Sequence, residues 1–353
     1  MSGNITSAEL GDGWPVSAPE GQGVDATILS GIGPHFEGSR ERCAHAVLVA
    51  RRGVLIYEHY FTSDDWCWTE PLGAVAFDAT VKHDLKSITK SVTSLMVGIA
   101  LDRGWVADID TPVFTYFPEH VGLRTPEKDR ITLAHLLTMS AGLAWNENLP
   151  WDDPANNERR MDDAADPYRY ALERPIATQP GQFYNYCGAA PTLLQGVVQR
   201  ASGKALDVLA REALLEPLGI TDVEWTRFPN GDVRGYGGMR LRARDLAKIG
   251  QLVLNRGTWQ GRRIISAEWT AKSTARQING EGIFFYGYLW WLGRFLVERR
   301  EIGWIAGFGN GGQRVYILPD LDLVVVVFAG AYGVPQIVGE NVMKRYVLPA
   351  IRQ

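Results

Sequence analysis

The chain has 353 residues, of which 46% are hydrophobic and 22% are charged, and its formal net charge is −4. This size and balance predict a soluble globular protein with a large core and room for two lobes. The weak negative charge gives no reason to expect nucleic acid or an anionic membrane as a partner. The 12 Trp, 13 Tyr and 12 Phe argue against a disordered chain.

Targeting segments and metal motifs are not apparent. Met1 to Ser7 lacks the basic and then apolar pattern of a signal peptide, and the apolar run from Leu323 to Ala331 is half a membrane span. The scattered Cys43, Cys67 and Cys187 are expected to be free thiols in a reducing compartment. The six histidines lack the short spacings of a helical zinc site. We therefore expect a cytoplasmic protein without a metal or other cofactor.

Apolar periodicity and turn residues divide the chain into expected elements. In order, we expect a loose arm (1–20), a helix (24–38), a hairpin (45–58), an irregular aromatic-rich stretch (64–86), helices (87–102, 132–139), a polar loop region lining a cleft (145–174), helices (192–202, 242–254), strands (286–291, 303–306), a hairpin (314–328) and a helix (336–352). Strands at both ends predict a sheet domain from residues 1–85 and 235–353, interrupted by a mainly helical domain, 86–234.

A serine and a lysine stand three residues apart where the central helix begins. Residues 86–100 read Lys-Ser-Ile-Thr-Lys-Ser-Val-Thr-Ser-Leu-Met-Val-Gly-Ile-Ala. A helix starting near Ser87 would bring Lys90 onto the same face one turn later. The Ser87 hydroxyl would then lie at the helix N-terminus, where free N–H groups favour developing negative charge. A capping serine looks the same, and about one Ser-x-x-Lys arises by chance in such a chain, so the spacing alone decides nothing.

Two other motifs do not fit their context. Gly307 to Gly312 matches G-x-G-x-x-G, but a strand follows it where a dinucleotide site needs a helix. Ser140 resembles the serine of a nucleophile elbow, but the first glycine is missing and a helix precedes it.

The downstream sequence adds pieces in a consistent order and spacing. They are Ile131 to Leu133, His135 to Leu143, Pro180-Gly181, Tyr186, Arg244 to Lys248, and Gly309 to Pro319. Together with Ser87 and Lys90, they make residues from about 45 to 330 resemble the serine hydrolases of the β-lactamase and penicillin-binding protein superfamily. The resemblance is to the branch of class C β-lactamases, esterases and 6-aminohexanoate-dimer hydrolases.

This resemblance implies an α+β fold of the β-lactamase/transpeptidase type, with an antiparallel sheet flanked by helices, an all-helical lobe and the active site between them. It implies Ser87 as the acylated nucleophile, Lys90 as its activating partner and Tyr186 as the tyrosine of the second motif, with Tyr184 as a competitor. Either Lys90 takes the serine proton, or a cationic Lys90 lowers the pKa of Tyr186 and the phenolate takes it; both stay open. The N–H groups of Ser87 and Asn310 would form the oxyanion hole.

Two motifs depart from the family pattern. The second usually reads Tyr-x-Asn or Tyr-x-Ser and is Tyr-Cys-Gly over residues 186–188. The third usually carries Lys or His, then Thr or Ser, then Gly, and is Gly-Phe-Gly over residues 307–309. The usual side chains hold the amide and carboxylate of a β-lactam, so efficient β-lactam hydrolysis is not expected. Substrate-binding candidates are Gly309, Gln313 and Trp145, the last in a region, 145–166, that lines the far wall in relatives.

We therefore expect a serine hydrolase that forms an acyl-enzyme at Ser87 and cleaves esters or unstrained amides of small molecules. One alternative is β-lactamase or D-alanyl peptidase activity. Another is a catalytically silent binding module, which the altered motifs would explain. The identity of the substrate and the oligomeric state stay open.

Overall fold

The computed structural model describes residues 11–38, 43–297 and 299–352, and its centre is an eight-stranded antiparallel sheet in the order β10-β11-β12-β13-β14-β15-β1-β2. The strands are β1 (Ala44–Arg51), β2 (Val54–Tyr60), β10 (Ile278–Asn279), β11 (Phe285–Tyr286), β12 (Trp291–Val297), β13 (Arg300–Gly309), β14 (Gln313–Leu318) and β15 (Leu323–Ala329).

β15 lies inside the sheet, between β14 and β1, and all seven of its residues, Leu-Val-Val-Val-Val-Phe-Ala, are buried. Val327 pairs with Val47 of β1, and Val325 pairs with Tyr316 of β14. A β-branched run without polar alternation suits a strand covered on both faces.

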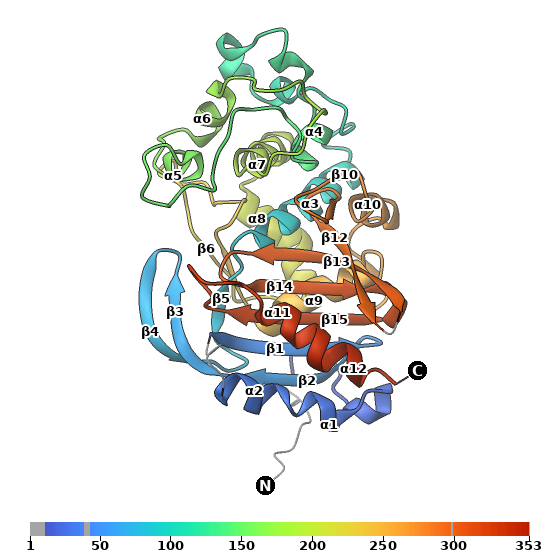
Figure 1. Cartoon of the computed structure of the whole chain (residues 1–353). Helices are drawn as coiled ribbons and strands as arrows, with labels where there is room; N and C mark the ends of the chain where they lie inside the picture. Colours follow the sequence, from blue (N-terminus) through green and yellow to red (C-terminus); the bar gives the residue numbers. More distant parts are fainter. Residues whose placement is uncertain (1–10, 39–42, 298, 353) are drawn as a thin grey trace.

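Helices cover both faces of this sheet (Figure 1). On one face, α9 (Ala243–Leu254) packs on β14 and β15, and a Cβ at Gly250 would lie 2.7 Å from the Val324 side chain. Helices from both chain ends cover the other face. These are α1 (Ala26–Leu29), α2 (Ile32–Gly38), α11 (Val338–Val342) and α12 (Leu348–Ala350).

A helical region lies above the sheet in Figure 1 and surrounds α7 (Ala189–Ser202). Its other helices are α4 (Leu133–Leu137), α5 (Asn157–Asp162), α6 (Pro167–Glu173) and α8 (Leu206–Ala210). The buried helix α3 (Ile88–Asp102) connects the two parts because it contacts both α7 and β13. These observations confirm the predicted fold class.

Smaller elements complete the chain. They are β3 (Thr62–Cys67) with β4 (Glu70–Ala76), β5 (Lys82–Asp84) with β7 (Met239–Arg242) and β6 (Glu224–Trp225), β8 (Thr258–Trp259) with β9 (Arg262–Arg263), α10 (Ala267–Ser273), and short 3₁₀ or π turns at Pro19–Gln22, Val113–Tyr116, Pro118–Leu123, Lys128–Arg130, Arg211–Leu215, Glu216–Leu218, Pro319–Leu321 and Met343–Val347. No helix in the described ranges has both the length and the apolar character that crossing a membrane requires.

Some predicted elements need correction. The stretch 64–86 is not irregular, because it contains most of the β3–β4 hairpin and all of β5. The single helix predicted over 24–38 is two short helices, and the region 145–174 includes α5 and α6. Residues 1–10 of the predicted loose arm lie outside the described residues. Beyond them the arm is anchored, since Trp14 is buried and donates from Nε1 to the Gly53 carbonyl at 2.9 Å.

Candidate active site

Ser87 occupies the position just before α3, the helix that contacts both the sheet and the helical region. The preceding residue, Lys86, has a φ of 49°, which a side chain other than glycine adopts at a cost of about 1–2 kcal/mol. Its side chain is held by the Trp68 carbonyl at 2.9 Å and the Asp84 carboxylate at 2.8 Å. The strained turn presents the Ser87 side chain to the cleft, where it lines two pockets.

Lys90 is the buried partner of Ser87. Its Nζ lies 2.9 Å from Ser87 Oγ and donates to the Tyr236 carbonyl oxygen at 2.9 Å. The side chain is 1% exposed, and its Nζ lies over the rings of Tyr186 (4.8 Å) and Tyr236 (5.3 Å). This setting fixes the amine against the nucleophile and keeps water from it.

Tyr186 faces the same group from the loop before α7, and its hydroxyl is hydrogen-bonded to Ser87. Its ring stacks on Trp291 with centroids 5.8 Å apart. Burial raises the pKa of the Tyr186 phenol well above its ordinary value, and the charge of Glu147 adds to this effect. The phenol is therefore protonated at neutral pH. The competing Tyr184 packs against Tyr286 and Trp291 and is not among the residues lining the pockets at Ser87.

Asn310 lines the same two pockets as Ser87. β13 ends at Gly309, and Asn310 follows it at the rim of both pockets that Ser87 lines. A Cβ at Gly309 would overlap the Leu85 carbonyl oxygen, so only glycine lets β13 approach the segment before Ser87 this closely. Within the described chain, the N–H groups of Ser87 and Asn310 have no hydrogen-bond partner. Both are free to bind an oxyanion.

A pair of glutamates fills the place where the second motif has a side chain in relatives. A Cβ at Gly188 would lie 2.9 Å from Glu158 Oε2 and 3.3 Å from Glu147 Oε2. Glu147 Oε2 accepts from the Gly188 N–H at 2.6 Å and from Trp145 Nε1 at 2.7 Å, which fixes this carboxyl group beside Gly188. Burial raises the pKa of Glu158 well above its ordinary value, Glu147 adds to the rise, and Lys90 opposes it. Glu158 thus carries the proton of a hydrogen bond to Glu147.

Glu158→Gln is expected to change how stability depends on pH. The pKa of Glu158 is higher in the folded protein than in the unfolded chain, where it is about 4.3. Above that pH the unfolded chain releases the proton while the folded protein keeps it. The free energy of unfolding therefore falls as the pH rises, until the pKa of the folded state is passed. Glutamine removes that loss, so the melting temperature of the variant relative to wild type should increase from pH 4 to pH 8. The exposed Glu301, changed to Gln, is the control. A constant difference across this range would show that Glu158 titrates normally.

Ser87 stands where two pockets meet. One has a volume of about 190 Å³ and is lined by Trp68, Trp151, Tyr236 and Tyr332 among others. The other, of about 570 Å³, has an aromatic wall of Tyr186, Phe284, Trp291 and Phe308 and includes the carboxylates of Glu147, Glu158 and Glu281. A substrate can therefore extend from the nucleophile in two directions.

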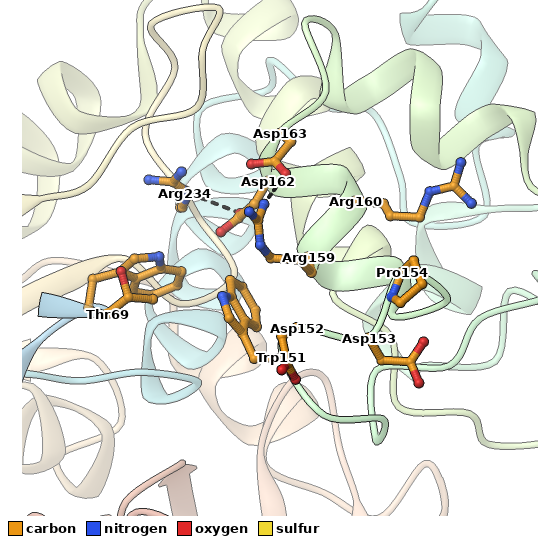
Figure 2. A pocket seen from close by; sticks show the side chains of 11 residues that line it. Thr69, Trp151, Asp152, Asp153, Pro154, Arg159, Arg160, Asp162, Asp163 and Arg234 are labelled. Carbon is orange, nitrogen blue, oxygen red and sulfur yellow. Dashed lines mark hydrogen bonds and ion pairs between the residues drawn. The ribbon is translucent and has the colours of Figure 1, made fainter.

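A third hollow, of about 960 Å³, adjoins the first pocket and shares Trp68, Thr69 and Trp151 with it. Figure 2 shows Arg234 and Arg159 turned toward Asp162 and Asp163, and both make ion pairs there. Asp152 and Asp153 lie on the loop before α5, away from these ion pairs (Figure 2). The region 145–166 thus lines the outer cleft.

Two predicted substrate-binding residues are placed elsewhere. Gln313 is fully buried, donates to the Ala329 carbonyl at 2.5 Å and accepts from the Ala329 N–H at 3.1 Å, so it braces the strand edge beside Asn310. Trp145 is 7% exposed and contacts Glu147 instead of lining the pockets at Ser87. Gly309 does line the pocket. Glu147 and Glu158 were not among the predicted site residues, because their only signal in the sequence is an acidic loop.

The fold and this site define a class, the hydrolases in which a serine and a lysine share the first turn of a helix between a sheet and a helical lobe. Residues 34–333 match the Beta-lactamase family. The chain therefore belongs to that family and is one of its serine hydrolases.

Among its relatives, the chain is 27% identical over 311 residues to the 6-aminohexanoate-dimer hydrolase of Paenarthrobacter ureafaciens, covering 81% of this chain and 72% of that one. It is 29% identical over 148 residues to Esterase EstB of Burkholderia gladioli, covering 39% and 37% of the two chains. The solved structure of a putative 6-aminohexanoate-dimer hydrolase from Bacillus anthracis shares the fold, with a TM-score of 0.72, 20% identity and coverage of 87% of this chain and 79% of that one.

Proposed function

We propose that this protein hydrolyses carboxylic esters or unstrained amides of small molecules through an acyl-enzyme at Ser87. One observation carries the proposal: Ser87 Oγ lies 2.9 Å from the buried Lys90 Nζ at the meeting point of two pockets. A hydroxyl with an adjacent base and room on both sides for a substrate is the arrangement that acyl transfer needs.

In the proposed reaction, Ser87 Oγ attacks the carbonyl carbon and its proton passes to Lys90 Nζ. The resulting oxyanion accepts from the N–H groups of Ser87 and Asn310. Lys90 and the protonated Tyr186 relay this proton to the departing alcohol or amine, which leaves the acyl group on Ser87. Water then attacks the acyl carbon and gives its proton to the same relay, which passes it to Ser87 Oγ as the ester bond breaks and the carboxylic acid leaves.

The surroundings of Ser87 favour substrates other than β-lactams. The third-motif position holds the Phe308 ring, and the second-motif position holds the Glu147–Glu158 pair where relatives have a side chain that holds the amide. Among the described residues, this pocket is lined by three carboxyl groups and by one cation, Arg314. Arg314 already donates to the Gly309 and Gln313 carbonyls. The pocket therefore disfavours a substrate carboxylate. The names of two relatives, a 6-aminohexanoate-dimer hydrolase and an esterase, also support substrates other than β-lactams.

The experiment compares p-nitrophenyl acetate, p-nitrophenyl butyrate, a p-nitroanilide and nitrocefin, and treats the protein with a fluorophosphonate. We expect ester turnover, slow or no nitrocefin turnover, and stoichiometric labelling of the peptide that contains Ser87. The Ser87→Ala variant sets the background for both measurements. Absence of labelling together with absence of turnover would favour a silent binding module. Nitrocefin turnover as fast as ester turnover would refute the argument from the missing anchors.

A further inference from the structure

Three buried side chains from three strands converge behind the active site. They are His45 on β1, Asp65 on β3 and His83 on β5, and they are 0%, 1% and 0% exposed. His45 Nδ1 lies 2.7 Å from His83 Nε2, and Asp65 Oδ1 lies 3.2 Å from His83 Nε2 and 3.6 Å from His45 Nδ1. Three potential ligand atoms therefore surround one point.

The other nitrogen of each ring is already committed. His45 Nε2 lies 3.0 Å from the Asp64 carbonyl, and His83 Nδ1 lies 2.9 Å from the Asp84 carbonyl. A carbonyl oxygen only accepts, so each ring donates from that nitrogen. A neutral imidazole has only one N–H. When both rings are neutral, His45 Nδ1 and His83 Nε2 therefore carry lone pairs that face each other. Ligands to a metal have this arrangement, with the second N–H held by a carbonyl.

The carboxylate of Asp65 is buried without a lysine or arginine paired to it in the part of the chain that the structure describes. Its neighbours are His83 Nε2, 3.2 Å from Oδ1, and the Trp66 N–H. A buried carboxylate without a cation costs several kcal/mol. Together with two lone pairs in contact, this leaves the cluster short of positive charge.

The two rings are also fixed in orientation before any ion binds. Phe77 stacks on His45 with centroids 4.3 Å apart, and Phe328 stacks on His83 at 4.8 Å, both with interplanar angles of 17°. A Cβ at Gly330 would lie 2.8 Å from His45 Nε2, so glycine there leaves room for the ring. A pre-oriented site loses little entropy on binding an ion.

We propose that His45 Nδ1, His83 Nε2 and Asp65 Oδ1 bind a divalent transition metal, with Zn²⁺ as the first choice. Zinc takes His and Asp ligands at about 2.0–2.1 Å, which separates tetrahedral ligand atoms by roughly 3.3 Å. Two of the three separations lie within a few tenths of an ångström of this value, and the pair of ring nitrogens has to open by roughly half an ångström.

The metal would have a structural role that reaches the cleft. The cluster residues do not line the pockets at Ser87, but Asp65 lies on β3, and the β3–β4 hairpin carries Trp68 and Thr69 at its turn. Figure 1 shows this light-blue hairpin standing beside the main sheet. A metal would fasten the hairpin to β1 and β5 and so fix one wall of the cleft. The sequence-based expectation of no metal rested on helical ligand spacing, which does not cover ligands from three strands.

The experiment measures metal in tag-free protein expressed with added zinc. Elemental analysis should find about one zinc per chain, and chelation should lower the melting temperature by about 3 °C or more, with recovery on adding equimolar Zn²⁺. His83→Gln and Asp65→Asn should each reduce the zinc below about 0.1 per chain, whereas the control His59→Gln, on the neighbouring strand β2, should retain it.

Wild-type protein without a bound transition metal, and without a thermal shift on adding Zn²⁺, would overturn the proposal. A proton shared between the two rings would then balance Asp65. Full zinc content in His83→Gln would overturn it as well. The wild-type measurements do not depend on whether either variant folds.

Discussion

Lys90→Met is expected to reduce kcat for p-nitrophenyl butyrate by about 10³-fold or more. Methionine has a similar length and fills the same buried space, but it cannot accept the Ser87 proton or donate to the Tyr236 carbonyl. The variant keeps the aromatic packing around residue 90, so the loss should appear in the chemical step. Single-turnover kinetics with a chromogenic ester would measure it directly, with Ser87→Ala as the zero level.

Lys248→Met is the matched control. Lys248 is as deeply buried as Lys90, but it lies on α9 and donates to the Asp12 carbonyl at 3.1 Å. Its replacement should cost stability and leave kcat nearly unchanged. If Lys90→Met retained most of the wild-type rate, Lys90 would not take the serine proton, and a Tyr186 phenolate would become the preferred base.

Gly309→Ala is expected to lower kcat by about 10²-fold without unfolding the protein. The new methyl group would overlap the Leu85 carbonyl oxygen and lie 2.9 Å from the Gln313 Cβ, so the end of β13 has to move outward. That movement would carry the Asn310 N–H away from the position proposed for the oxyanion. KM should change much less, because the aromatic pocket walls remain.

Gly303→Ala is the control for Gly309→Ala, because it makes the same substitution at another position of the strand. Gly303 lies on the same strand, and a Cβ there would have no atom within 4 Å. Steady-state kinetics of the two variants, each with its melting temperature, separate a catalytic effect from a general weakening of β13. Equal losses in both would contradict the assigned role of the Gly309 position.

The parts of the fold that follow from local pattern were predicted well. The β14–β15 hairpin is a run of buried β-branched residues, and α3 has regular apolar spacing. The β3–β4 hairpin was missed because β4, Glu-Pro-Leu-Gly-Ala-Val-Ala, is exposed along nearly its whole length and shows no alternation of apolar and polar residues. Trp14 was placed in a loose arm because its contacts, with Gly53 and Trp259, lie far along the chain.

The grouping of three site residues could be expected only from the family resemblance, because the Ser-x-x-Lys spacing alone is a chance-level signal. In the structure, Lys90 Nζ lies 2.9 Å from Ser87 Oγ and 4.8 Å from the centre of the Tyr186 ring. The glutamate pair was not predictable, because Glu147 and Glu158 become partners only through a loop that folds over Gly188. Gln313 looked like a substrate ligand because the chain position fits, but its amide is used entirely by its own sheet edge.

The pairing of β1 with β15 has a consequence for how the protein folds. Val47 and Val327 are neighbours although nearly the whole chain separates them, so the loop closure behind this contact is slow. During synthesis, β1 and β2 have no neighbour on the β15 side until the last strand leaves the ribosome. The early hairpin then exposes an unpaired apolar edge, which is open to association with other chains. The pocket at Ser87 is completed late as well, because Phe308 and Asn310, which line it, are synthesised shortly before β15.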